Sequence, residues 1–368
     1  MISASQQIRF CTTSDGVRIA YAVTGTGPPL VRAAVRFTHI EFDQASPVWR
    51  HWLAELSRGR TLVRYDERGC GLSDWNAKDL SFEACVRDLE AVVDAAGLMR
   101  FALISILRGG GMVAVAYAAR HPDRVSHLVL HGACARGRLA SAGTPKERDE
   151  EEVIIKLIEL GWGEGNEAFR HLFAKQFVPD GTPEQHRSIE ELLRLSTSSA
   201  NAARLSREFG TVDVRELAKK IRCPTLVMQA REELRTSLEE GRQLAALIPD
   251  ARFILLESRN RLLTEDEPAW ARFAAEVRAF LPSTLPDREA KTLQGKFASL
   301  SARERDVLEF IAEGFDNNQI AEQLELSEKT VRNHINSIFA KLEVPTRAQA
   351  IVRARQAGFG QGNTRTLD

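Results

Sequence analysis

The stretch Phe101-Ala-Leu-Ile-Ser-Ile-Leu-Arg-Gly-Gly110 joins an apolar run to two adjacent glycines. A short apolar run that ends at glycine is typical of a buried strand, and the segment Met112–Arg120 behind it predicts a helix. The same alternation continues in both directions along the chain. Because strands that alternate with helices form a mostly parallel sheet covered on both faces, the sequence predicts an α/β fold.

The other elements of this fold follow from the same patterns of apolar residues. Strands are expected at Val17–Val23, Pro29–Ala34, Thr61–Tyr65, Phe101–Ile106, Val125–His131, Thr225–Gln229 and Arg252–Glu257. Helices are expected at Trp49–Leu56, Phe82–Ala96, Leu238–Leu247 and Pro268–Leu281. Together they predict one α/β domain over residues 1–281.

The alternation is interrupted between about residues 138 and 220, where the pattern is helical and no strand is convincing. Apolar residues recur at helical spacing in Glu151–Leu160, Glu167–Phe177 and Pro183–Leu195. A helical insert between two halves of one sheet is most simply a cap over the carboxyl ends of the strands. Proline and charged residues then predict a linker at 282–295, followed by an all-helical domain at 296–368.

Composition restricts the class of protein. The chain has 368 residues, of which 43% are apolar and 27% charged, and its 50 basic and 50 acidic residues leave it formally neutral. Its five scattered cysteines form no CxxC pair, which excludes a zinc framework and a secreted disulfide scaffold. The N-terminus lacks the apolar run of a signal peptide, and no apolar stretch is long enough to span a membrane. We therefore expect a cytoplasmic protein without metal, cofactor or membrane partner.

The C-terminal domain carries a pattern suited to DNA. Ser301-Ala-Arg-Glu304 is a capping box before a helix that Gly314 ends, and Ser327 is placed to cap a third helix, Glu328–Leu342. That helix buries Val331, Ile335, Ile338, Phe339 and Leu342 on one face. Its other face shows Lys329, Arg332, Asn333 and Asn336. Arginine and asparagine suit guanine and adenine edges, whereas Thr330 and Lys341 are expected to contact phosphates.

Charge alone leaves a second interpretation of this domain open. Residues Lys296 to Arg355 contain nine basic and nine acidic side chains, so a three-helix interaction module also fits the periodicity. The residues themselves resemble a known family. The matching positions are Leu300-Ser-Ala-Arg-Glu-Arg-Asp-Val-Leu308, Gly314, Asn317, Ile320-Ala321, Leu326-Ser-Glu-Lys-Thr-Val-Arg-Asn-His334, Ile338, Lys341-Leu342 and Arg347. This segment resembles the LuxR-type helix-turn-helix, which implies that Gln319–Leu324 crosses the DNA backbone and Glu328–Leu342 enters the major groove.

The large domain resembles another family. Asp66-Glu-Arg-Gly-Cys-Gly-Leu-Ser-Asp74, the Phe101–Gly110 stretch and Arg120-His-Pro-Asp-Arg-Val125 are similar to segments of α/β-hydrolases. In that family a G-x-S-x-G turn carries the nucleophile. Aligned on Gly109, this chain has Leu107 at that position, and a hydrocarbon cannot attack a carbonyl.

The remaining triad positions follow in the order acid, then base. Glu233 stands at the acid position and Arg261 at the base position. None of the eight histidines lies between His186 and His334, so no histidine can supply the base in that order. Because arginine stays protonated, it cannot accept the proton, and we expect it to pair with Glu233 instead. Ser105 and Cys70 are expected to be packed and unreactive.

The resemblance leaves a sheet, a cap and a pocket between them. Its expected lining is Val35, Arg36, Leu107, Arg108, Trp162, Phe169, Phe173 and Arg261. The favoured function is a transcription regulator whose inactive hydrolase-like domain senses a small organic ligand. Its implied partners are double-stranded operator DNA, a second copy of the chain and RNA polymerase. In the family, two copies are often joined through the last helix, which corresponds here to about Arg347–Ala357. Two alternatives stay open: an active hydrolase for an ester, lactone or amide, and a ligand-free dimerisation scaffold.

Overall fold

The computed structural model describes residues 6–162, 166–281, 296–344 and 346–360. Its centre is an eight-stranded sheet in the order β1-β2-β4-β3-β5-β6-β7-β8. The strands are β1 (Gln7–Thr12), β2 (Arg18–Thr24), β3 (Pro29–Arg32), β4 (Thr61–Tyr65), β5 (Phe101–Ile106), β6 (Val125–His131), β7 (Thr225–Ala230) and β8 (Arg252–Leu256). Strands β1 and β2 pair antiparallel and β2 with β4 likewise, while all other pairs are parallel. The predicted α/β sheet is confirmed, with β1 added at its edge.

Alternate residues of the central strand β5 enter two separate hydrophobic cores. Phe101 and Leu103 belong to one core, whereas Ala102, Ile104 and Ile106 belong to the other. This happens because successive side chains of a strand point to opposite faces of the sheet. All six residues of β5 are buried, so both faces of the sheet must be covered.

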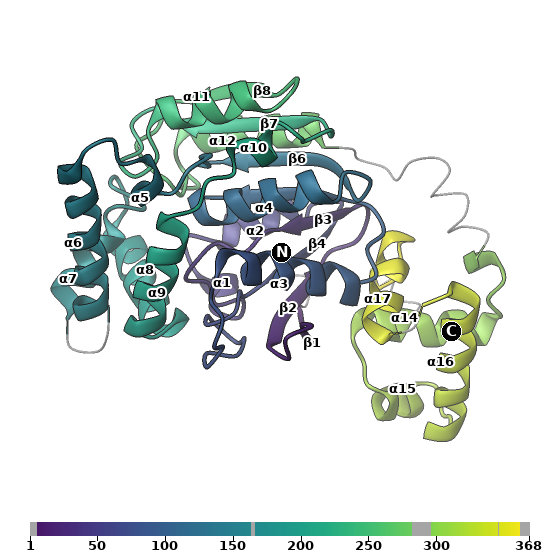
Figure 1. Ribbon diagram of the computed structural model, residues 1–368. Coiled ribbons are helices and arrows are strands. Elements are labelled where there is room, and N and C mark those ends of the chain that lie inside the picture. The colour runs from purple at the N-terminus through teal and green to yellow at the C-terminus, as the bar shows by residue number, and fades with distance from the viewer. Residues whose placement is uncertain (1–5, 163–165, 282–295, 345, 361–368) are drawn as a thin grey trace.

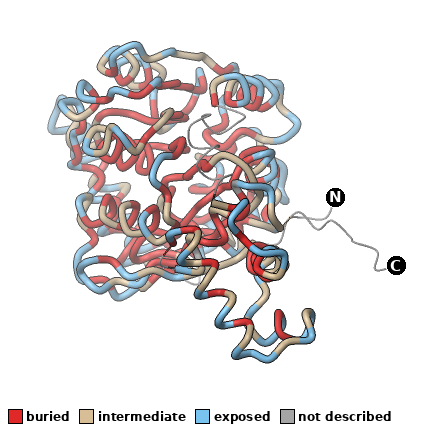
Figure 2. Tube along the Cα trace, turned by 90° about the vertical axis from the view of Figure 1, so that its right-hand side faces the viewer, coloured by how far each residue is buried: buried red, intermediate tan, exposed pale blue. Residues whose placement is uncertain are grey.

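Helices cover each face (Figure 1). The first face carries α3 (Phe82–Ala95), α4 (Arg108–Arg120), α10 (Arg215–Ala218) and α11 (Leu238–Leu247). The second face carries α2 (Arg50–Leu56) and α12 (Pro268–Phe280), with the short α1 (Phe42–Ala45) preceding α2. Most residues of the inner strands β2–β7 are buried, whereas the edge strands β1 and β8 are largely half-buried or exposed. The buried segments appear red in the interior of Figure 2.

The cap between β6 and β7 is helical, as predicted. It contains α5 (Arg138–Ser141), α6 (Pro145–Gly161), α7 (Glu167–Ala174), α8 (Pro183–Ser196) and α9 (Ser199–Gly210). Capping boxes at Thr144 and Thr182, each followed by proline at the first helical turn, start α6 and α8. The cap helices α6–α9 lie together at one end of the sheet (Figure 1).

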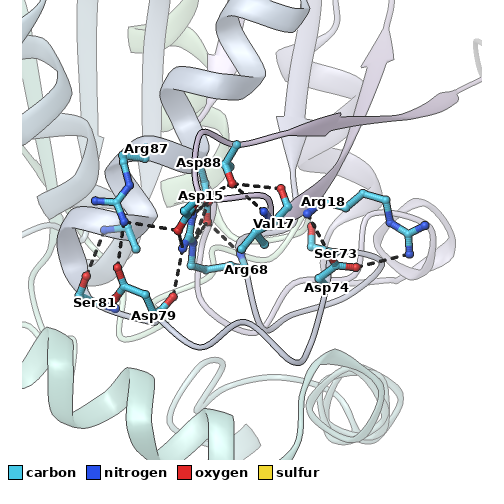
Figure 3. Close-up of polar contacts among 12 residues, drawn as sticks. Asp15, Val17, Arg18, Arg68, Ser73, Asp74, Asp79, Ser81, Arg87 and Asp88 are labelled. Carbon is cyan, nitrogen blue, oxygen red and sulfur yellow. Dashed lines mark hydrogen bonds and ion pairs between the residues drawn. The ribbon is translucent and has the colours of Figure 1, made fainter.

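The Asp66–Asp74 loop is held by a network of ion pairs and hydrogen bonds (Figure 3). Asp66 accepts hydrogen bonds from the backbone amides of Ile40 and Leu72, at 3.1 and 2.9 Å. The buried Arg68 guanidinium reaches Asp88 and Asp15, each at 2.7 Å. These residues anchor the loop between the sheet and α3, and their charges are paired or hydrogen-bonded within the network.

The C-terminal domain contains α14 (Ala302–Glu313), α15 (Asn317–Gln323), α16 (Glu328–Leu342) and α17 (Arg347–Gln356). It lies on the opposite side of the large domain from the cap (Figure 1), with α17 against the sheet domain. Arg355 donates from Nη1 to the carbonyl of Val23 at 2.9 Å, and its own carbonyl accepts from Gly27 N–H at 3.2 Å. Val352 is fully buried in the large-domain core. The linker expected at 282–295 lies outside the described residues. Among the helices that the structure describes, none has the length and hydropathy to cross a membrane.

Candidate functional site

The turn between β5 and α4 is strained. Leu107 has φ 72° and ψ 164°, a conformation that L side chains rarely adopt and that costs about 1–3 kcal/mol. Its N–H donates to the His131 carbonyl at 2.7 Å, and its carbonyl accepts from Gly111 N–H at 3.0 Å. A Cβ at Gly110 would lie 2.6 Å from the Ala34 carbonyl oxygen, so this backbone packs more closely than any side chain allows. The surroundings therefore impose the sharp strand-to-helix turn on a leucine.

A cavity of about 60 Å³ lies between this turn and the cap. The end of the sheet contributes Arg36, Phe37, Leu107, Arg108 and Gly109, and the segments after β7 and β8 contribute Arg235 and Arg261 respectively. The cap contributes Arg138, Glu151, Ile158, Phe173, Phe177, Ser206, Phe209 and Gly210. Guanidinium and phenyl groups thus share one small space.

The structure brings five of the eight expected lining residues to this cavity: Arg36, Leu107, Arg108, Phe173 and Arg261. For Val35, Trp162 and Phe169 the expectation was wrong. Val35 and Trp162 are 2% and 1% exposed in the core behind the wall. The Trp162 ring packs 4.3 Å from that of Phe37, and Phe169 stacks 5.7 Å from Phe173. They support the lining rings from behind instead of forming the surface.

Glu233 and Arg261 form the expected contact. Arg261 Nε lies 2.8 Å from Glu233 Oε1, and Gln229 donates to the other carboxylate oxygen at 3.0 Å. Burial raises the pKa of Glu233 above its ordinary value, although the Arg261 guanidinium opposes the shift. Arg261 also lies over the Phe177 ring, 5.0 Å from its centre. The acid and base positions therefore satisfy each other.

Other candidate nucleophiles lie away from the cavity. Ser105 is fully buried within β5, and its hydroxyl has no hydrogen-bond partner among the described residues. Cys70 is fully buried, and burial raises the pKa of its thiol well above the ordinary value. Neither residue belongs to the lining of the cavity.

One histidine near the turn between β5 and α4 was not predicted as a neighbour of the site. His131 ends β6, and its Nε2 lies 3.1 Å from the Arg261 carbonyl oxygen. Its ring is fully buried beside Trp52 and Phe273, and burial lowers its pKa to about 4. It does not line the cavity, and no sequence signal brings it to this position because the contact depends on the pairing of β6 with its neighbours.

Two arginines of the cavity were missed by the sequence analysis. Arg138 and Arg235 both contact Glu151, at 2.8 and 3.2 Å. They belong to the first cap helix and to the segment after β7, about a hundred residues apart. Only the folding of the cap onto the sheet brings them together.

The C-terminal domain presents its third helix as predicted. Ser301 forms a capping box with Glu304, Gly314 ends α14 with φ 105°, and Ser327 caps α16 by accepting from Thr330 N–H at 3.1 Å. Of the five side chains expected on its inward face, four are buried and Phe339 is partly buried against the same core. Four polar residues expected at the DNA surface are exposed: Lys329, Arg332, Asn333 and Asn336.

Thr330 and Lys341 are engaged within the domain. The Thr330 hydroxyl lies 2.8 Å from that of Ser327, and Lys341 Nζ lies 2.7 Å from Glu304 Oε2. Burial would raise the pKa of Glu304, but hydrogen bonds from Lys341, Ser337 and Ser301 outweigh it and lower that pKa to about 2. Lys341 thus joins α16 to α14, a structural role that the phosphate-contact prediction did not include.

Comparison with known families agrees with both parts of this architecture. The family model "alpha/beta hydrolase fold" matches residues 42–268, and "Bacterial regulatory proteins, luxR family" matches residues 298–354. The chain belongs to the α/β-hydrolase fold family. It carries in addition a LuxR-family regulatory domain at its C-terminal end, so the molecule is a fusion of the two.

Relatives match one part or the other. Pyrrolizixenacetamide deacetylase of Xenorhabdus hominickii is 27% identical over 273 residues, covering 68% of this chain and 97% of that protein. The transcriptional regulatory protein DesR of Bacillus subtilis is 37% identical over 82 residues, covering 22% of this chain and only 39% of that regulator. A hydrolase from Pseudomonas aeruginosa PA01 has the same fold, with a TM-score of 0.62 and 23% identity over 74% of this chain and 98% of its own.

Proposed function

We propose that this LuxR-type regulator binds a small organic ligand in its hydrolase-like domain without converting it, and that the bound ligand alters DNA binding. The observation that carries the proposal is Leu107 at the strained turn, where it lines the cavity beneath the cap. A turn of this kind presents the nucleophile in α/β-hydrolases. Here the presented group is a hydrocarbon, and the base position is occupied by an arginine paired with Glu233.

The rival function is hydrolysis, and an assay with purified full-length chain on activated esters separates the two. We expect the parent chain to hydrolyse these esters no faster than the Ser105→Ala, Cys70→Ala and Glu233→Gln variants do. A rate above this level that one of the three substitutions abolishes contradicts the proposal. The ligand-free scaffold is disfavoured by the cavity itself, since a filled interior would leave no volume beneath the cap.

The route from the cavity to the DNA-binding domain is proposed to pass through the large domain to α17. Arg355 and Gln349 connect this helix to the Val23 and Asp94 carbonyls. A ligand changes DNA affinity only if it binds two arrangements of the domains with different affinities. A DNA fragment is first selected by its retention on the purified chain. Its affinity for the chain is then measured by fluorescence anisotropy, with and without a ligand that has been found to bind.

We also propose that two copies act together on DNA, because one helix-turn-helix contacts only a half-site. Light scattering of the chain with a two-half-site fragment should give two protein copies per duplex. One copy on each duplex at saturation contradicts the homodimer. Contact with RNA polymerase follows from the proposed regulatory role and is tested by co-retention on the same fragment.

A further inference from the structure

The cavity contains more guanidinium groups than carboxylates to balance them. Arg261 pairs with Glu233 at 2.8 Å and Arg108 with Glu240 at 2.9 Å. Arg138 and Arg235 share Glu151. Four arginines therefore share three carboxylates, and a fifth, Arg36, remains to be considered.

Arg36 has no carboxylate within 4.0 Å among the described residues. Its Nη1 donates to the Leu205 carbonyl at 3.3 Å, and its guanidinium lies over the rings of Phe209 and Phe37, 5.1 and 5.7 Å from their centres. Burial lowers the pKa of Arg36, and Arg235 and Arg108 lower it further. Glu67 and, less strongly, Glu151 favour its charge. Burial raises the pKa of Glu67 to about 8, so that this carboxyl is mostly protonated at neutral pH, and Glu151 is already shared by Arg138 and Arg235. Arg36 is thus a charged group of the wall without a full counter-charge.

The position of Arg36 adds to this imbalance. A Cβ at Gly109 would lie 3.1 Å from Arg36 Nε, so the guanidinium packs directly on the first turn of α4. The first amides of a helix have no partner within the helix, and this end carries partial positive charge. A cation against this end is unfavourable by itself, whereas an anion in the cavity beside them can contact both the guanidinium and the helix terminus.

The cavity also has an apolar lining, and the space is small. The apolar side chains lie among the arginines: Phe37, Ile158, Phe173, Phe177 and Phe209. The cavity volume of about 60 Å³ holds about four to six non-hydrogen atoms, at about 10–15 Å³ for each water-sized group. A fully polar anion would leave the phenyl rings uncovered, and the small volume favours a short alkyl chain over a long one.

We propose that the cavity binds a short-chain aliphatic monocarboxylate, with its carboxylate beside both Arg36 and the first turn of α4 and its alkyl chain against the phenyl rings. This inference rests on the proposed ligand-sensing function and names the chemical class of the ligand. The planar guanidinium fork matches a carboxylate in two parallel hydrogen bonds. Gly109 allows this approach because it has no side chain.

Isothermal titration of the full-length chain tests the site with three probes: butyrate, its uncharged analogue butyramide, and inorganic phosphate. We expect saturable binding of butyrate, and binding at least about tenfold weaker for each of the other two. Arg36→Gln should weaken butyrate binding by at least about tenfold, and Arg36→Lys by less. The matched control is Arg259→Gln, whose guanidinium is 52% exposed outside the cavity, and it should bind as the parent chain does.

Equal affinity for butyrate and butyramide, tighter binding of phosphate, no binding of butyrate, or an unchanged Arg36→Gln variant with a native thermal midpoint would each overturn the inference. DNA anisotropy with the same probes separates it from the proposed function. If butyrate binds at Arg36 but leaves DNA affinity unchanged, the anion site stands and ligand sensing through it fails. If butyramide alone changes DNA affinity, sensing stands and the carboxylate assignment fails.

Discussion

Single residues decide what this domain presents to a ligand. Leu107 takes the strained position at the end of β5, where its side chain adds an apolar surface to the cavity. Arg261 forms an ion pair with Glu233 at 2.8 Å, because its guanidinium stays protonated. Under the proposed function, Leu107 and Arg261 each remove a chemical step of hydrolysis.

The Glu233–Arg261 pair gives a stability prediction. Glu233→Gln leaves the Arg261 guanidinium buried without its partner, and we expect a loss of about 3–5 kcal/mol in the free energy of unfolding. The double variant Glu233→Gln/Arg261→Met removes both charges and should lose less than the sum of the two single variants. Urea unfolding of all four chains measures this coupling, and additive losses would show that the two groups do not interact.

Glu67 gives a pH prediction. Burial raises its pKa from 4.5 to about 8, so the folded chain keeps a proton that the unfolded chain releases. The unfolded state then binds fewer protons, and stability falls as pH rises between 4.5 and 8, by about 5 kcal/mol at most. Glu67→Gln should flatten this part of the pH dependence in urea unfolding. A variant that follows the parent curve throughout would mean that Glu67 is ionised in the folded protein.

At the scale of elements, patterns of apolar residues predicted seven strands and most helices. A strand buried on both faces is a continuous run of apolar residues, which is easily seen in a sequence. The edge strand β1 was missed because half-exposed Gln, Arg and Thr residues dilute its pattern. Helix α4 begins at Arg108, four residues before its predicted start. Its glycines disfavour helix in isolation, but they are needed where the backbone touches Ala34 and Ala133.

The third helix of the C-terminal domain gives a DNA-binding prediction. Asn333→Ala or Arg332→Ala should cost about 1–3 kcal/mol on the preferred site and relax specificity, if these exposed side chains contact base edges. Competition assays with altered half-sites measure both quantities. An equal loss on all sequences would assign the two residues to the phosphate backbone.

Lys341 requires a paired experiment, since it is 2.7 Å from Glu304. Lys341→Met and Glu304→Gln both break this ion pair and should both destabilise the C-terminal domain. Only Lys341→Met should also reduce the slope of log affinity against log salt, by about one unit, if the lysine contacts a phosphate. Matching salt slopes in the two variants would leave Lys341 with a purely structural role.

At the scale of the whole molecule, α17 belongs to two packing systems. Ala350, Ile351 and Ala354 are buried within the C-terminal domain, whereas Val352 is buried in the large-domain core. Arg355 donates to Ala312 inside its own domain and to Val23 across the boundary, at 3.0 and 2.9 Å. The helix expected to join two copies therefore also joins the two domains of one copy.

Arg355→Met tests this connection. It should speed amide hydrogen exchange in α17 and in the residues near Val23, because two interdomain contacts are weakened. Binding to a single half-site should stay within about twofold, since the polar face of α16 is exposed in the docked arrangement. Unchanged exchange would show that Val352 and Gln349 suffice to hold the domains together.

The sequence by itself determined the two folds, the limits of most elements and the chemistry of positions 107, 233 and 261. These depend on local periodicity, capping residues and the order of positions along the chain, which need no knowledge of distant contacts. Tertiary structure alone decided which arginines meet at the cavity, that Trp162 and Phe169 stand behind its wall, and that Lys341 is paired. Such contacts join segments far apart in the chain, and the packing of the cap on the sheet, not any local pattern, brings them within reach.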